Sequence, residues 1–147
     1  MYSQFLVDDD AGIAEIVRGA RRVAVLGAKS EAEPSEAAYI VPEWLRRHGV
    51  EILPVPLGAD APAELFGAPA YRRLADVPGA VDVVDVFRRS REVGEFVDDL
   101  LAMKPRCVWM QLGIRNDAAA EKLARAGIRV VQDRCLMEEF RRLGLGR

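Results

Sequence analysis

The sequence predicts an α/β fold, a Rossmann-like three-layer sandwich in which a five-stranded parallel sheet carries helices on both faces. Five short apolar runs alternate with helical patterns along the chain, and this alternation requires a parallel sheet with right-handed crossovers. The first run, residues 22–26, is apolar after its first residue, as expected of a strand that is covered on both faces. It leads directly into Gly27, so a strand, a tight turn and a helix follow one another. In such sheets ligands bind at the carboxyl ends of the strands, where the strand order reverses.

The chain opens with a predicted helix over residues 10–20. Acidic residues at positions 8–10 favour a helix start, because they lie near the positive end of the helix dipole. Ile13, Ile16 and Val17 form an apolar stripe at helical spacing, and we expect this stripe to pack against the sheet.

A second helix and a second strand follow the polar loop after Gly27. The helix is expected to begin near Ala38 and to end at Gly49, a residue type that suits the end of a helix. Pro42 is tolerated if it lies close to the first turn, whose N–H groups have no partner inside the helix. The strand spans residues 51–55, and the prolines near its end force extended backbone and terminate it.

The middle of the chain has an irregular pattern. Residues 57–80 are rich in glycine, proline and alanine, and they predict two isolated helical turns, over 64–67 and 71–76. The third strand follows at residues 81–87, where valine dominates. A strand of this composition again fits a parallel sheet that is covered on both faces.

The C-terminal part continues the alternation of helices and strands. Ser90 is a plausible N-cap for a helix that Pro105 ends, and the fourth strand spans residues 107–112. Asn116 is expected to cap the next helix, over residues 117–126. The remaining predicted elements are a strand over residues 128–131 and a helix over residues 137–143.

The size and charge of the chain limit its partners. Its 147 residues suffice for one domain with a substantial core, which we assign to residues 1–147. A formal charge of −2 gives no electrostatic reason to expect nucleic acid or an anionic membrane as a partner. No apolar run approaches the roughly 20 residues of a membrane span, and the N-terminus lacks the pattern of a secretory signal. A cytoplasmic location is therefore expected.

The turn at Gly27 indicates a phosphate contact rather than a common nucleotide signature. A dinucleotide fingerprint needs glycines at the positions of Lys29 and Ala32 and an acidic residue at the end of the second strand, so NAD is disfavoured. A P-loop needs a glycine directly before the lysine, so ATP hydrolysis is rejected. Gly27, Lys29 and Ser30 favour close approach of the backbone to a phosphate, with a purely structural glycine turn as the alternative.

Polar residues also follow the third and fourth strands. Arg88 and Arg89 could pair with phosphates, and Phe87 could pack on a base or a pantetheine arm. A core phenylalanine followed by two solvated arginines is an equally good interpretation. Gln111 is polar at the end of an apolar strand, which favours a ligand contact, whereas Asn116 suits an N-cap.

The sequence lacks a recognisable catalytic set. Cys135 follows the fifth strand beside Arg134 and could be a reactive thiolate, although a structural turn is preferred. Asp82 and Asp85 lie three residues apart in the third strand, so they face opposite sides of the sheet and do not form a carboxylate pair. His48 is the only histidine and suits a helix end, and it does not make a metal site with the two cysteines.

Five segments together resemble a known family. They are VAVLGA at residues 23–28, HGV and ILPV within 48–55, VDVVDVFRRS at 81–90, VWMQLGIRN at 108–116 and VQDRC at 131–135. In this order and spacing they resemble the small stand-alone CoA-binding proteins of bacteria and archaea. Those proteins are similar to the CoA-binding domain of the succinyl-CoA synthetase α subunit. The resemblance covers residues 10–140, and its specific parts are the third and fourth strings.

The resemblance implies a Rossmann-like domain that holds CoA at the carboxyl ends of its strands. The loop after the first strand would meet the phosphates, the end of the second strand would flank the adenine, and the segments after the third and fourth strands would line the remaining path. The candidate cofactor-binding residues are Gly27, Ala28, Lys29, Ser30, Val55, Pro56, Phe87, Arg88, Gln111, Leu112, Gly113 and Asn116. The chain carries Pro56-Leu57 where family members commonly have Asn-Pro, and its loop after Ala28 is less rich in Ser, Asn and Pro.

These observations favour a non-catalytic module that binds CoA or an acyl-CoA and acts as a carrier, buffer or sensor. The alternatives are an oxidoreductase that uses NAD(P), an acyltransferase that acts through Cys135, and a regulatory subunit docked on a larger acyl-CoA enzyme. A mixed disulfide between Cys135 and CoA under oxidising conditions is a further hypothesis. A homodimer is also open, because the apolar residues Leu6, Val7 and Phe66 lie outside the predicted core elements.

Overall fold

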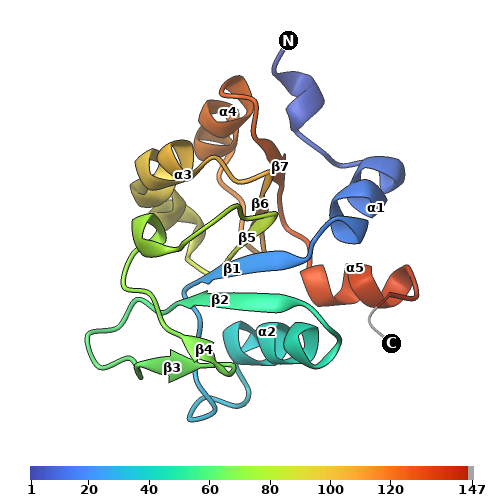
Figure 1. The fold of residues 1–147 in the computed structure, drawn as a ribbon. Helices are drawn as coiled ribbons and strands as arrows, with labels where there is room; N and C mark the ends of the chain where they lie inside the picture. The colour runs from blue at the N-terminus through green and yellow to red at the C-terminus, as the bar shows by residue number, and fades with distance from the viewer. Residues whose placement is uncertain (146–147) are drawn as a thin grey trace.

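A computed structural model describes residues 1–145 and confirms the predicted α/β architecture. A five-stranded parallel sheet with strand order β2-β1-β5-β6-β7 lies between two layers of helices (Figure 1). The strands of this sheet are β1 Arg22–Leu26, β2 Glu51–Val55, β5 Val83–Val86, β6 Cys107–Met110 and β7 Arg129–Val131. The helices are α1 Asp10–Arg18, α2 Ala37–Arg47, α3 Val97–Met103, α4 Asp117–Arg125 and α5 Leu136–Arg142. No helix within the described residues is long and apolar enough to cross a bilayer.

The core consists of one apolar layer on each face of the sheet. Successive strand residues point to opposite faces, so Val23 and Val25 pack against α1, α2 and α5, whereas Ala24 and Leu26 pack against α3 and α4. The largest fully buried side chain, Trp109, lies in the first of these layers. Strands that are buried on both faces explain why the predicted runs contain so few polar residues.

The strand order reverses beside β1. The chain passes from β1 to β2 on one side of it and then returns to β5 on its other side. Right-handed crossovers place the connecting helices on opposite faces, so the chain leaves the ends of β1 and β5 toward opposite faces of the sheet. A crevice at the carboxyl ends of these two strands is the expected result.

Both edges of the sheet are covered by the chain itself. At one edge, Pro54 lies inside β2 rather than ending it, and its carbonyl accepts a hydrogen bond from the N–H of Tyr71 at 2.9 Å. Proline fits there because its missing donor faces the outer side of an edge strand. At the other edge, Leu6 forms a parallel bridge with Val130, and the Val7 N–H donates to the Val130 carbonyl at 2.9 Å.

Two of the predicted dimer contacts are used inside the chain. Val7 and Phe66 are partly buried and pack against the core layer that contains Trp109. Phe66 also stacks on Tyr39, with 5.9 Å between ring centroids.

The helical turn predicted over residues 64–67 is wrong. Two short antiparallel strands, β3 Glu64–Leu65 and β4 Ala68–Pro69, form a hairpin there. The two turn residues, Phe66 and Gly67, have φ values of 53° and 71°, which is the left-handed backbone that a tight two-residue hairpin turn needs. The other predicted turn is present as a 3₁₀ helix, Leu74–Asp76.

Ser90 does not cap a helix as predicted. It begins a 3₁₀ helix, Ser90–Phe96, that precedes α3. Its hydroxyl instead accepts a hydrogen bond from the N–H of Arg115 at 3.0 Å. The side chain therefore joins the loop after β5 to the loop after β6. Strands β5 and β6 are also shorter than predicted, and Phe87 and Gln111 belong to these loops.

Candidate functional site

Two adjoining cavities lie at the carboxyl ends of the strands. The smaller, of about 540 Å³, lies between the loops after β1 and β2 and is lined by Ser30 and Pro56 among others. The larger, of about 670 Å³, lies over the ends of β5 and β6 beside the start of α2. Lys29, Phe87 and Arg88 line both cavities, so the two form one continuous site at the point where the strand order reverses.

Gly27 brings the loops after β1 and β5 into contact. Its φ is 89°, and a Cβ atom at this position would lie 2.7 Å from the carbonyl oxygen of Phe87. The N–H of Gly27 donates to the Val55 carbonyl at 2.9 Å. Gly27 is thus required by close packing of the backbone, and its own N–H is already used.

Pro42 has a different role from the predicted one. Because α2 begins at Ala37, Pro42 lies beyond the first turn and removes a regular helical hydrogen bond to the carbonyl of Ala38. That carbonyl accepts a hydrogen bond from the N–H of Lys29 instead, at 3.1 Å. The proline therefore frees an acceptor that ties the loop after β1 to α2.

The start of α2 presents free N–H groups to the larger cavity. Glu36 is the N-cap, but its side chain makes no capping hydrogen bond. Among the described residues, the N–H groups of Ala37 and Ala38 have no hydrogen-bond partner, and both residues line the larger cavity. The N–H of Ala28, between the two cavities and α2, is likewise without a partner there. Such groups at the start of a helix favour a bound anion.

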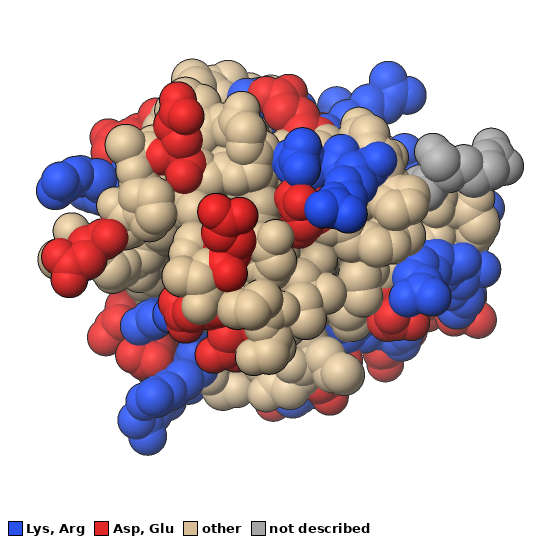
Figure 2. Space-filling model, turned by 90° about the horizontal axis from the view of Figure 1, so that it is seen from below, with Lys and Arg blue, Asp and Glu red and all other residues tan. Residues whose placement is uncertain are grey.

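The basic side chains at the site are partly neutralised by acidic neighbours. Lys29 lies 3.8 Å from Glu33, and the Arg88 guanidinium donates to Glu92 at 2.9 Å. The Nε atom of Arg88 is buried and has no partner among residues 1–145. Arg89 and the acidic residue Glu36 also line the larger cavity. On the face drawn in Figure 2, Lys and Arg side chains are likewise interspersed with Asp and Glu and form no continuous basic surface.

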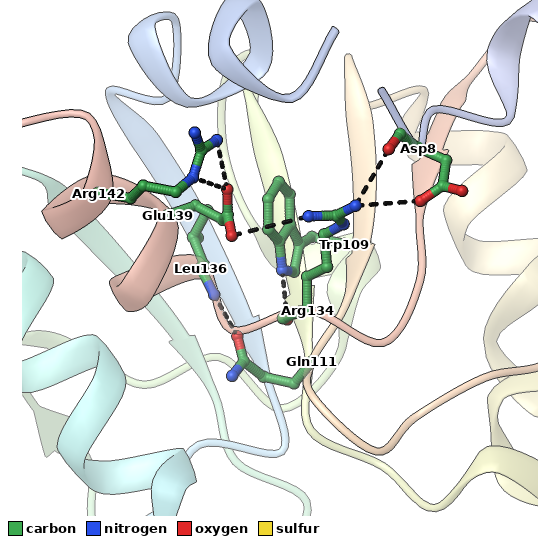
Figure 3. A network of polar contacts seen from close by, with 7 residues as sticks. All are labelled: Asp8, Trp109, Gln111, Arg134, Leu136, Glu139 and Arg142. Atoms are coloured by element: carbon green, nitrogen blue, oxygen red, sulfur yellow. Dashed lines mark hydrogen bonds and ion pairs between the residues drawn. The ribbon is translucent and has the colours of Figure 1, made fainter. Parts of the chain in front are cut away.

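Gln111 presents an unused donor to the larger cavity. Its side chain is only 3% exposed, and its amide oxygen accepts a hydrogen bond from the Leu136 N–H at 3.0 Å (Figure 3). Because a backbone N–H can only donate, the atom that faces it must be the oxygen, and the amide nitrogen points the other way. This nitrogen has no hydrogen-bond partner within the described part of the chain. Leu112, which is 69% exposed, also lines the larger cavity.

The segment after β7 is fixed by side chains from β6. The indole N–H of Trp109 donates to the Arg134 carbonyl at 2.8 Å. Gln111 holds the next part of the segment by accepting from the Leu136 N–H. The Arg134 guanidinium also contacts Asp8 at 3.1 Å and Glu139 at 3.8 Å (Figure 3). Cys135, which lies between the two anchored residues, is partly buried and lines the larger cavity.

Most of the sequence-predicted residues meet at this site. Lys29, Phe87 and Arg88 line both cavities, and the remaining lining residues are Gly27, Ala28, Ser30, Pro56, Gln111, Leu112 and Gly113. The N–H of Gly113 is occupied by the Asp133 carboxylate at 2.6 Å.

Two of the predicted residues lie outside both cavities. Val55 is fully buried and contributes only its carbonyl, which accepts from Gly27. Asn116 caps α4 by accepting from the Ala119 N–H at 2.9 Å, and its amide donates to the Ser90 carbonyl at 2.8 Å. Both residues hold loops of the site by hydrogen bonds, Val55 to Gly27 and Asn116 to Ser90.

The residues at the start of α2 were not singled out from the sequence. Glu36, Ala37 and Ala38 line the larger cavity although none of them has a distinctive side chain for ligand binding. Their signal is positional, because a helix that begins after a β1 turn points its first N–H groups toward the carboxyl edge of the sheet.

Two buried titratable groups lie in the core rather than at the site. Asp85 is fully buried in β5 beside Val25 and Trp109, and neither carboxylate oxygen has a partner within residues 1–145. Burial raises the pKa of Asp85 well above its usual value. Burial also raises the pKa of the Cys107 thiol to about 12. Asp82 directly precedes β5, and its carboxylate accepts a hydrogen bond from the N–H of Arg22 at 2.8 Å. Within the described residues, no group of three or more His, Cys, Asp or Glu side chains could hold a metal ion.

Comparison with known proteins gives consistent matches. A model of the CoA binding domain matches residues 21–141. The uncharacterized protein YneT of Bacillus subtilis is 31% identical over 126 residues, which are 86% of this chain and 90% of that protein. A structure from Thermus thermophilus, named cell-free ID.343, has a TM-score of 0.85 and 39% identity and covers 92% of this chain and 99% of its own.

A more distant likeness is confined to the fold. The dinucleotide-forming acetyl-coenzyme A synthetase 1 of Ca. Korarchaeum cryptofilum matches with a TM-score of 0.58 and 23% identity. The match covers 75% of this chain but 25% of that enzyme.

Proposed function

Because the chain belongs to the family of CoA binding domains, we propose that it binds coenzyme A, or an acyl-CoA, across the carboxyl ends of β1, β5 and β6 without catalysing a reaction. One observation carries the proposal. Two cavities join at Lys29, Phe87 and Arg88, and they offer N–H groups and cations next to apolar walls. A long ligand with a phosphorylated end and a thin amide-bearing arm matches this distribution.

The phosphates of CoA fit the part of the site between the β1 loop and α2. The N–H groups of Ala28, Ala37 and Ala38 are free there, and Lys29 and Arg88 supply positive charge. The smaller cavity, with Pro56 among its lining residues, would hold the adenine side of the ligand.

The pantetheine arm fits the larger cavity. Phe87, Leu112 and Ile114 give it an apolar wall, and the free amide nitrogen of Gln111 would donate to an amide carbonyl of the arm. CoA supplies a thiol at the end of this arm, which carries acyl groups as thioesters.

The proposal of binding without catalysis rests on the absence of a histidine beside the hydroxyl and thiol groups of the cavities, within the described residues. Ser30, Ser90 and Cys135 line the cavities, but no histidine does so within the described residues. The single histidine, His48, follows the far end of α2, where its ring nitrogen lies 2.7 Å from the Trp44 carbonyl. Nucleophilic catalysis by a hydroxyl or thiol normally requires an adjacent base.

Calorimetric titration of ligand-free protein tests the proposal. CoA should bind with micromolar or tighter affinity, and NAD and ATP should give little heat, because neither carries a pantetheine arm. An acyl-CoA incubated with the protein should be recovered intact. Binding of NAD without binding of CoA, or turnover of the thioester, would contradict the proposal.

A further inference from the structure

Cys135 lies in the cavity that the proposed function assigns to the thiol-bearing arm of CoA. It is one of two cysteines, neither of which is in a disulfide, and the two differ sharply in surroundings. Cys107 is fully buried in β6, whereas Cys135 is partly exposed and lines the larger cavity together with Phe87 and Gln111.

The backbone on both sides of Cys135 is held by the neighbouring strand. Trp109 anchors the Arg134 carbonyl, and Gln111 anchors the Leu136 N–H (Figure 3). Both anchoring side chains are at least 97% buried, since Trp109 is 0% and Gln111 3% exposed. The thiol is therefore carried by a fixed segment rather than by a mobile loop end.

A second observation in the same cavity points to a ligand. The amide nitrogen of Gln111 is a donor on a side chain that is almost fully buried, and it has no partner among the residues described. A ligand with a carbonyl group at this place would give the amide nitrogen the hydrogen-bond partner that the protein does not supply. Pantetheine has amide carbonyls, and its chain ends in a sulfur atom.

We propose that Cys135 is a thiol–disulfide exchange site for oxidised CoA, a proposal that rests on CoA binding in the larger cavity. The Cys135 thiol loses its proton to solvent, and its sulfur attacks one sulfur atom of a CoA disulfide. A bond forms between Cys135 and that sulfur, the original S–S bond breaks, and the second CoA leaves as a thiolate that takes up a proton. Cys135 is oxidised and one CoA is reduced, so no further oxidant is needed. A free thiol reverses the step.

The mass of the intact protein tests the proposal directly. Reduced, ligand-free protein is incubated with CoA disulfide and, separately, with oxidised glutathione, which has the same reactive bond but no nucleotide. One adduct is expected, with the mass of CoA less two hydrogen atoms, and it should disappear after treatment with dithiothreitol. Its formation should be at least tenfold faster than that of the glutathione adduct, and peptide mapping should place it on Cys135.

Matched variants separate the two cysteines. Cys135→Ser should form no adduct, whereas Cys107→Ala should form it at the rate of the unchanged protein. Gln111→Glu keeps an oxygen that can accept from the Leu136 N–H but loses the amide donor, so it should slow the reaction with CoA disulfide several-fold more than the reaction with oxidised glutathione. An adduct on Cys107, or equal rates for the two disulfides, would overturn the proposal.

The outcome is distinguishable from a failure of CoA binding. Calorimetry with desulfo-CoA, which lacks the thiol, measures binding alone. If desulfo-CoA binds but CoA disulfide leaves no adduct, the exchange site is wrong and the proposed function stands. If desulfo-CoA does not bind, both proposals fail.

Discussion

At the scale of single residues, Gly27 combines a positive φ with a close contact to backbone, whereas Gly49 has the positive φ alone. Both Gly27 and Gly49 have a φ near 90°, at which side chains are strained. Only at Gly27 would a Cβ atom also collide with backbone, 2.7 Å from the Phe87 oxygen, because no atom lies within 4 Å of that position at Gly49. The two glycines therefore separate strain of the backbone from contact between loops.

This contrast gives a measurable difference in stability. Gly49→Ala should lower the free energy of unfolding by about 1–2 kcal/mol, the cost of a left-handed alanine. Gly27→Ala must also push apart the loops after β1 and β5, and we expect a loss of about 3 kcal/mol or more. Urea denaturation of both variants measures the two losses. Equal losses would show that the approach of Gly27 to Phe87 is unimportant.

Asp85 predicts a pH dependence of stability. Its pKa is raised in the folded protein, so the folded state keeps a proton that the unfolded chain releases as the pH rises above its ordinary value near 3.8. The free energy of unfolding should therefore fall as the pH increases from about 4 toward 7, until the raised pKa is passed. Asp85→Asn removes this titration, and its unfolding free energy should change less over that range. Denaturation at several pH values tests this, and equal slopes for both proteins would contradict it.

At the scale of elements, the 3₁₀ helix after β5 carries an acidic residue that competes for a cation of the site. Glu92 accepts from the Arg88 guanidinium at 2.9 Å, and a phosphate would have to share that group. Glu92→Gln should raise the affinity for CoA about two- to fivefold, the scale of a partly exposed ion pair. Glu95→Gln on the same element makes the same charge change away from this contact and should have little effect. Calorimetry at low salt measures both, and a weaker affinity of Glu92→Gln would mean that Glu92 positions Arg88 instead.

The strands were predictable because their apolar runs are long enough to show a pattern. The hairpin β3–β4 was missed because strands of two residues have no periodicity, and because Phe66 adopts a positive φ that its residue type does not suggest. The role of Pro42 was missed for another reason. Its effect depends on Lys29, a residue in a different element, which uses the carbonyl that the proline leaves free.

The candidate site was likewise predictable from the sequence only in part. The rule for parallel sheets gathers the residues after each strand at one edge, so the site could be located from the sequence. The sequence could not show which N–H groups remain free, because the partners of Gly27, Lys29 and Gly113 lie 9 to 28 residues away, as Val55, Ala38 and Asp133. Asn116 and Val55 were grouped with the binding residues because they lie at the ends of strands or in the loops after them, but neither residue lines either cavity.

At the scale of the whole molecule, the N-terminal segment closes the edge of the sheet beside β7. Removing residues 1–7 deletes the bridge between Leu6 and Val130 and the hydrogen bond from Val7. We expect the free energy of unfolding to fall by at least about 1 kcal/mol, the net value of a hydrogen bond. The exposed strand edge should also favour self-association, which sedimentation velocity at increasing concentration would detect. A truncated protein that stays as stable and as monodisperse as the full chain would contradict this role.

The anchoring of Arg134 and Leu136 determines how a change at Cys135 could be sensed. Both neighbours are hydrogen-bonded to buried side chains of β6, so the cysteine has no hinge on either side. A mixed disulfide on Cys135 should therefore leave the backbone unchanged, so the proteins with and without it should have the same fold. A second protein that distinguishes the two states would therefore have to contact the bound thiol compound itself, and Leu112, which lines the larger cavity and is 69% exposed, offers a surface beside it.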